Sequence, residues 1–134
     1  MITAVDTNIL LDVFLASDEH APRSREWLRD AYEAGAIIVC DIVYAELVPA
    51  FTDRASLDGA LERMGITVSQ IDRSTSYEAG LRWKRYRASG GPRNRIIADF
   101  LIGAHAAATA DRFLTRDRGF FANYFPELLS ASTS

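Results

Sequence analysis

Apolar and polar positions along the chain follow two alternating patterns. Short runs rich in apolar and β-branched residues predict strands at residues 3–5, 36–40, 66–70 and 112–115. Between them, apolar residues three and four positions apart predict helices over residues 8–15, 22–34, 41–48, from Asp53 or Ser56 to Met64, from Asp72 or Ser74 to Ala88, 97–109 and 120–124. Strands separated by helices favour a three-layer α/β fold, with a mostly parallel central sheet of four to five strands and helices on both faces.

The size of the chain suits one domain. It has 134 residues, of which 49% are hydrophobic, which is enough to bury a core. We expect the domain to cover residues 1–129 and a flexible tail to follow at residues 130–134. No apolar run approaches the roughly 20 residues needed to cross a bilayer, and the N-terminus lacks the pattern of a signal peptide. The sequence therefore predicts a cytoplasmic protein with no membrane partner.

Carboxylates flank several of the predicted strands. Asp6 follows the first strand, Glu46 lies in the helix after the second strand, Asp99 begins the helix before the last strand, and Asp117 follows that strand. Because ligands of open α/β sheets bind at the carboxyl ends of the strands, all four are expected at one edge. Simpler explanations exist, since Asp6 and Asp99 could be N-caps and Asp117 a turn residue beside Gly119. Glu46 stands among apolar neighbours, which predicts a buried glutamate that needs a partner.

Four neighbouring carboxylates predict a particular chemistry. Like charges at close range raise one another's pKa, and burial adds to the cost of ionisation. A divalent cation removes this cost, and oxygen ligands without nearby His or Cys favour Mg²⁺ or Mn²⁺ over Zn²⁺. One or two such ions can activate a water molecule and stabilise the leaving oxygen of an in-line displacement. The four residues therefore point to metal-dependent hydrolysis of phosphodiesters.

These residues, in this order, resemble a known family. Asp6-Thr7-Asn8, Glu46, Asp99 with its following alanines, and Thr115-Arg116-Asp117 are similar to the PIN-domain ribonucleases, and at this length to the VapC-type toxins of bacterial and archaeal toxin–antitoxin pairs. The resemblance covers residues 2–129. It implies that Asp6, Glu46, Asp99 and Asp117 are the catalytic residues and bind Mg²⁺ or Mn²⁺, with Asn8 and Thr115 supporting them by hydrogen bonds.

The same resemblance implies a substrate and partners. It implies an endoribonuclease that hydrolyses structured RNA, such as transfer or ribosomal RNA. It also implies a homodimer and a cognate antitoxin protein, whose inserted tail places a basic side chain in the acidic pocket.

Basic residues are concentrated in one part of the chain, although the net charge is -3. The window from Arg82 to Arg95 contains six basic residues and no Asp or Glu. Such a window is usually a solvated face, but it could also hold RNA phosphates around the acidic pocket. Arg87, Arg93 and Arg95 are the candidate RNA contacts, the last two because they lie just before Asp99.

Other reactive side chains have structural explanations. Cys40 ends an apolar run, which predicts a thiol packed in the core. His20 is expected to be exposed in a polar loop, and His105 is expected in the core or at an interface. No catalytic role is assigned to any of the three.

Two other functions remain compatible with the sequence. A phosphatase that uses Asp6 as nucleophile would normally carry a second acid two residues later and a lysine near the phosphate, whereas this chain has Asn8 and a single lysine, Lys84. A non-catalytic binding module would use the acidic pocket only to receive a basic peptide. Metal-dependent RNA cleavage, a stable acyl-phosphate, or binding without cleavage would distinguish the three.

Overall fold

A parallel sheet forms the centre of the molecule. The computed structural model describes residues 1–90 and 95–131. Its strands are β1 (Ile2–Val5), β2 (Ala36–Cys40), β3 (Ile66–Ser69) and β4 (Arg112–Leu114). They lie in the order β3-β2-β1-β4, and each neighbouring pair is parallel. The predicted parallel α/β fold is confirmed, with four strands in the described ranges.

Helices connect the strands and also follow the last one. They are α1 (Thr7–Phe14), α2 (Ala21–Ala34), α3 (Asp41–Leu47), α4 (Arg54–Arg63), α5 (Arg73–Ala88), α6 (Ile97–Thr109) and α7 (Arg118–Tyr124), with the 3₁₀ helices η1 (Val48–Ala50) and η2 (Pro126–Ala131). Over residues 1–90 and 95–131, none of them is both long and apolar enough to cross a bilayer. Most of the expected tail at residues 130–134 lies outside the described residues.

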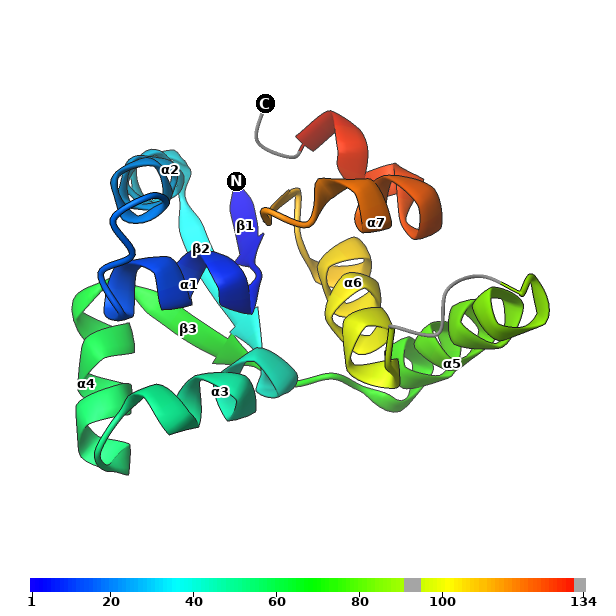
Figure 1. The fold of residues 1–134 in the computed structure, drawn as a ribbon, viewed down its shortest axis with the longest axis horizontal. Helices are drawn as coiled ribbons and strands as arrows, with labels where there is room; N and C mark the ends of the chain where they lie inside the picture. The colour runs from blue at the N-terminus through cyan, green and yellow to red at the C-terminus, as the bar shows by residue number, and fades with distance from the viewer. Residues whose placement is uncertain (91–94, 132–134) are drawn as a thin grey trace.

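The strand order explains where the helices lie. From β1 the chain moves outward to β2 and β3, and then returns to place β4 on the other side of β1. Because crossovers between parallel strands are right-handed, reversing the direction of travel moves the helices to the opposite face. Figure 1 shows the outcome, with α1 to α4 grouped on one side of β1 and β2, and α5 to α7 on the other.

The core contains apolar side chains from the sheet and from both helical groups. An aromatic cluster fills it beside β4, where Phe113, Phe120 and Phe125 are almost fully buried. Gly103 of α6 lies against this cluster, and a Cβ atom at that position would stand 2.5 Å from the ring of Phe125. The absence of a side chain at residue 103 therefore allows α6 to pack closely on η2 and its neighbours.

The register of the central pair of strands determines the position of the site. Val5 lies beside Leu114, so the residues that follow them, Asp6 and Thr115, leave the sheet side by side. The Asp6 N–H donates to the Leu114 carbonyl over 2.9 Å, which extends the pairing by one residue. The strand order reverses between β1 and β4, because the chain leaves β1 toward one edge of the sheet and returns to form β4 at the other. Open α/β sheets bind ligands at such switch points.

Candidate active site

Asp6 is held at the carboxyl end of β1 by several hydrogen bonds. It is the N-cap of α1, and its Oδ1 accepts from the Thr7 N–H over 2.8 Å. Its Oδ2 accepts from the Thr115 hydroxyl over 2.7 Å and from the Asn8 amide over 3.3 Å. The helix-cap interpretation of Asp6 is thus correct, and the capping carboxylate lies where β1 and β4 end. That Asn8 and Thr115 support a metal site remains a prediction.

The environment of Asp6 opposes its ionisation. Its side chain is buried, with 8% of the residue exposed. Burial raises the pKa of Asp6 from 3.8 to about 6; the charges of Glu46 and Asp117 add to the rise, while hydrogen bonds from Thr115 and Thr7 oppose it. Because the donors around Asp6 are neutral, a cation is the partner that would offset its charge.

Glu46 reaches the site from α3. Its Oε1 accepts from the Thr7 hydroxyl over 2.6 Å, which places it one residue from Asp6. The expectation that Glu46 is buried is wrong, because the residue is exposed. Only Val43 and Leu47 of α3 are buried, so the apolar neighbours of Glu46 in sequence do not surround it in space. Thr7, which sequence reasoning had not assigned a role, orients this carboxylate.

Asp117 is paired with Arg95, which lies just before α6. Arg95 contacts both carboxylate oxygens, with Nη2 to Oδ1 at 3.0 Å and a closer contact between Nη1 and Oδ2. The Arg95 guanidinium also lies over the ring of Phe120, 4.4 Å from its centroid. The Asp117 N–H donates to the Thr115 hydroxyl over 2.9 Å, so Thr115 links Asp117 to Asp6. Asp117 is more than a turn residue beside Gly119.

Asp99 lies at the beginning of α6. It is not the N-cap considered from the sequence: Ile96 is the N-cap of α6, and Asp99, the third residue of the helix, accepts the Ile96 N–H at its Oδ2 over 3.1 Å. The residue is half-buried, and its charge acts on Arg95. Asp99 therefore interacts electrostatically with Arg95, whereas the charges of Glu46 and Asp117 raise the pKa of Asp6.

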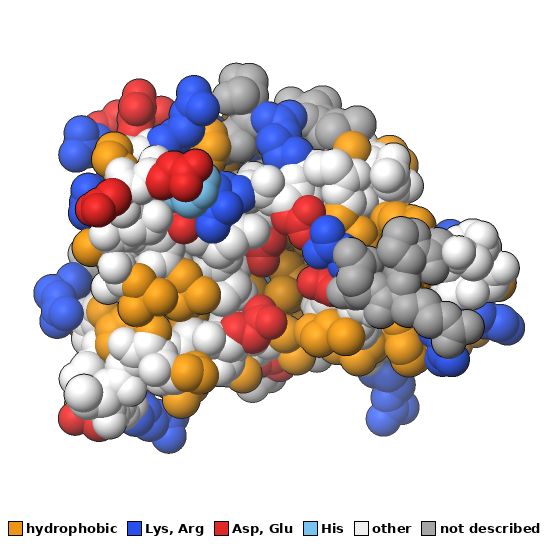
Figure 2. Space-filling model, in the orientation of Figure 1, with side chains coloured by type: hydrophobic (Ala, Val, Ile, Leu, Met, Phe, Trp, Pro, Cys, Tyr) orange, Lys and Arg blue, Asp and Glu red, His pale blue; other side chains and the backbone are white. Residues whose placement is uncertain are grey.

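The acidic residues gather at one place without forming a closed metal cage. Figure 2 shows acidic side chains in a hollow near the middle of one face, with basic side chains at its edges. Among the residues that the structure describes, no three His, Cys, Asp or Glu side chains lie close enough to hold a metal ion as they stand. The atoms around Asp6 that could bind a metal ion are carboxylate and hydroxyl oxygens, and Mg²⁺ and Mn²⁺ prefer oxygen ligands. The residues fit such an ion chemically, and their carboxylates would have to move closer around it.

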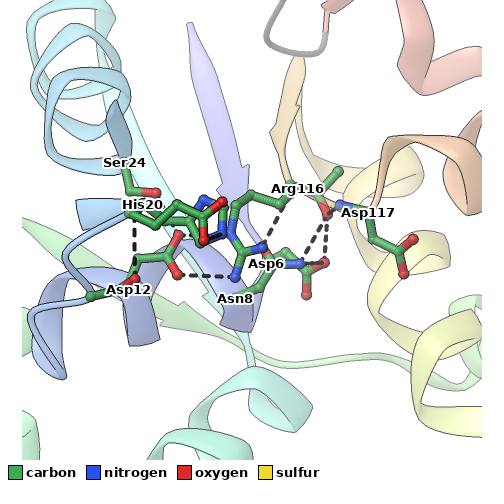
Figure 3. A network of polar contacts seen from close by, with 10 residues as sticks. Asp6, Asn8, Asp12, His20, Ser24, Arg116 and Asp117 are labelled. Carbon is green, nitrogen blue, oxygen red and sulfur yellow. Dashed lines mark hydrogen bonds and ion pairs between the residues drawn. The ribbon is translucent and has the colours of Figure 1, made fainter. Parts of the chain in front are cut away.

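A second polar network, centred on Asp12, adjoins Asp6. The Arg116 Nε and Nη2 atoms donate to Asp12 over 2.8 Å and 3.0 Å, and the Ser24 hydroxyl donates to Asp12 over 2.7 Å. The Arg116 N–H donates to the Asn8 side-chain oxygen over 3.2 Å. Figure 3 shows the Arg116 side chain reaching Asp12, with Asn8 beside it. The helical spacing of Asn8 and Asp12 was the signal in the sequence, but their shared partner lies 104 residues beyond Asp12.

The predicted RNA contacts lie in different settings. Arg87 is exposed at the end of α5, over the ring of Trp83 at 5.0 Å. It lines a cavity of about 830 Å³ together with Trp83, Lys84 and Arg95. Arg95 is held by Asp117, as described above, and Arg93 lies outside the described residues.

The cysteine and histidines lie near the expected positions, with one exception. Cys40 is buried in the core, and burial raises the pKa of its thiol to about 11. His105 is also buried, where its Nε2 lies 3.0 Å from the Ser69 hydroxyl, and desolvation lowers its pKa. His20 is half-buried rather than exposed, because it lies at the start of α2 against neighbouring side chains.

Comparison with known proteins agrees with this geometry. The PIN domain profile matches residues 3–126. No curated protein matches the chain significantly by sequence. The structure is similar to that of VapBC2 from Rickettsia felis bound to a promoter DNA fragment, with a TM-score of 0.71 and 19% identity over 93% of this chain and 94% of that chain. It is also similar to VapBC-1 from nontypeable Haemophilus influenzae, with a TM-score of 0.71 and 18% identity over 100% and 98%.

A third similar structure is a toxin–antitoxin complex from Klebsiella pneumoniae, with a TM-score of 0.67 and 18% identity over 98% of this chain and 96% of that chain. At these identities the likeness shows the fold. The profile covers nearly all of the chain and includes Asp6, Glu46, Asp99 and Asp117. The chain belongs to the PIN domain family, a family of nucleases.

Proposed function

We propose that this chain is a Mg²⁺- or Mn²⁺-dependent endoribonuclease that acts as the toxin of a toxin–antitoxin pair. The observation that carries the proposal is Asp6, a buried carboxylate at the switch point whose pKa is raised to about 6 by burial and by neighbouring carboxylates. A divalent cation offsets such a charge, and membership of a nuclease family supports phosphodiester hydrolysis as the reaction.

The chain's own residues have defined parts in this reaction. The ion would be held by the carboxylates of Asp6, Glu46, Asp99 and Asp117. When bound, it would supply an activated water and offset charge on the leaving oxygen. Thr115 and Asn8 fix the orientation of Asp6, and Thr7 fixes that of Glu46. Arg95 holds a positive charge at the edge of the site, where a substrate phosphate would approach.

The substrate and partners proposed here are those that the resemblance to VapC-type toxins implies. We infer a structured RNA, such as transfer or ribosomal RNA, with Arg87, Arg93 and Arg95 as contacts to its phosphates. The similar structures are of VapBC and other toxin–antitoxin complexes, which supports a cognate antitoxin protein as partner. An acidic hollow fits a basic side chain from that partner. We also propose a homodimer that acts in the cytoplasm, where RNA substrates are present.

Cleavage of total cellular RNA tests the proposal. The full chain is incubated with RNA and Mg²⁺ or Mn²⁺, with EDTA added in parallel, and the RNA ends are mapped. Asp6→Asn is prepared identically, and Asp30→Asn, which changes an exposed aspartate of α2, is the matched control. We expect discrete cuts that require both metal and Asp6 and that persist in Asp30→Asn.

Other results would replace the proposal. Equal cleavage by wild type and Asp6→Asn would mean that a contaminating ribonuclease is responsible. If no variant cleaves RNA but the wild type binds a basic peptide through its acidic hollow, the chain is a binding module. A stable acyl-phosphate on Asp6 would instead identify a phosphatase.

A further inference from the structure

A basic pocket lies directly beside the candidate active site. It has a volume of about 250 Å³ and is lined by His20, Arg23, Ser24, Trp27, Thr115, Arg116 and Arg118. Thr115 belongs to both sites, because its hydroxyl donates to the Asp6 carboxylate over 2.7 Å. A linear polymer that binds one of its repeating units at Asp6 could therefore place the neighbouring unit in this pocket.

The pocket has an excess of positive charge. Asp12 is 4% exposed and is paired with Arg116, so these two charges offset each other. Among the residues that the structure describes, neither Arg23 nor Arg118 forms an ion pair with an acid. His20 lies 3.7 Å from the carboxylate of Glu19. Arg23 and Arg118 therefore carry the charge that remains available to a ligand.

The walls of the pocket are held in place. Arg116 is fixed by both oxygens of Asp12, and Asp12 is fixed in turn by the buried Ser24 hydroxyl. On the α2 side, the guanidinium of Arg23 lies over the half-buried ring of Trp27, 5.3 Å from its centroid. Arginines positioned on rigid elements bind phosphate groups well, because less side-chain freedom is lost on binding.

We propose that this basic pocket binds a backbone phosphate of the RNA substrate, next to the phosphodiester that is cleaved at Asp6. The proposal rests on the proposed nuclease function, since it assigns a second contact to the same substrate. Arg23 and Arg118 bind the phosphate, while Arg116 positions the loop between the pocket and Asp6. The acidic site repels the substrate backbone, and the adjacent cations offset that repulsion.

RNA binding in the absence of cleavage tests the proposal. The full chain is titrated in EDTA with a fluorescein-labelled oligouridylate, and anisotropy is followed at several salt concentrations. We expect the Arg23→Ala/Arg118→Ala double variant to bind roughly tenfold more weakly, and its salt dependence to be shallower by about 1.4 in logarithmic slope, because each lost contact to single-stranded nucleic acid removes about 0.7. Arg29→Ala, an exposed arginine of the same helix, is the matched control and should bind like wild type.

The outcomes separate this proposal from the nuclease proposal. If the wild type cleaves RNA but the double variant binds with unchanged affinity and salt slope, the pocket assignment is overturned and the nuclease stands. If no metal-dependent cleavage occurs but binding depends on both arginines, the pocket stands and the nuclease does not. If the double variant loses affinity for a polyglutamate peptide but binds RNA with unchanged affinity and salt slope, the pocket binds an acidic protein partner and the RNA assignment is overturned.

Discussion

At the scale of single residues, the ionisation of Asp6 opposes folding. Its pKa is about 6 in the folded chain against 3.8 for an ordinary aspartate, so the native state holds this proton more tightly than the unfolded state does. For a carboxylate whose pKa is raised, stability is greatest when the group is protonated and falls as the pH rises from about 4 to about 6. Above that window the ionised group continues to destabilise the fold.

The Asp6→Asn variant should therefore be more stable than wild type at neutral pH in EDTA. The gain is at most about 3 kcal/mol in the free energy of unfolding, which corresponds to the rise in the pKa of Asp6 from 3.8 to about 6. Part of it is lost because one carboxylate oxygen accepts from Thr7 and the other from Thr115 and Asn8, whereas an amide has a single oxygen to accept with. Urea denaturation of both proteins from pH 4 to pH 8 would check this, and the gap should close toward the acid end. A wild type that is the more stable protein at neutral pH would show that Asp6 is not under strain.

At the scale of the elements, α6 packs against the aromatic cluster through Gly103. Replacing a glycine inside a helix by alanine ordinarily stabilises a protein by roughly 1 kcal/mol. At residue 103 the added methyl would meet the buried ring of Phe125 at 2.5 Å. Gly80 of α5 offers the opposite situation, because a Cβ there would have no atom within 4 Å.

Gly103→Ala and Gly80→Ala should consequently change stability in opposite directions. Overpacking should cost Gly103→Ala about 1–3 kcal/mol, and Gly80→Ala should gain up to about 1 kcal/mol. Chemical denaturation of both variants beside wild type measures the two changes. If Gly103→Ala were as stable as Gly80→Ala, the contact between α6 and Phe125 would be looser than the structure shows.

At the scale of the whole molecule, the site joins the two helical groups. Asp6 follows β1 and Glu46 lies in α3, whereas Asp99 lies in the first turn of α6 and Asp117 follows β4. A ligand bound between them contacts elements that come together only in the folded chain. Such a ligand stabilises the native state in proportion to its concentration relative to its dissociation constant, by about 2.7 kcal/mol at a hundredfold excess.

Mn²⁺ should therefore raise the midpoint of thermal unfolding. The rise should grow as the pH increases through about 6, because Asp6 must lose its proton to bind a cation. Asp6→Asn should abolish the rise, and the exposed-site variant Asp30→Asn should keep it. Differential scanning fluorimetry across a Mn²⁺ series measures these shifts, and a wild-type midpoint that Mn²⁺ leaves unchanged would contradict the proposed ligand set.

Several features of the molecule could be predicted from its sequence. The strand at Ala36–Cys40 and the helix at Ile97–Thr109 have the predicted bounds, because their apolar pattern, glycine and cap residues are all local signals. The position of Asp6 beside Thr115 also follows from the sequence, once the strands are taken as parallel, since the ends of parallel strands share an edge. Periodicity and chain order therefore determined the fold and the place of the site.

The side-chain partners were decided only by the tertiary structure. Glu46 is exposed and bound to Thr7, because the way α3 packs, and not its local composition, decides which of its faces is buried. Arg95 pairs with Asp117, and Arg116 with Asp12, across 22 and 104 residues of sequence. Such contacts depend on the angles and distances between packed elements, which no periodic pattern encodes. The sequence determined which elements form and which edge of the sheet carries the acids, while packing decided which charges meet there.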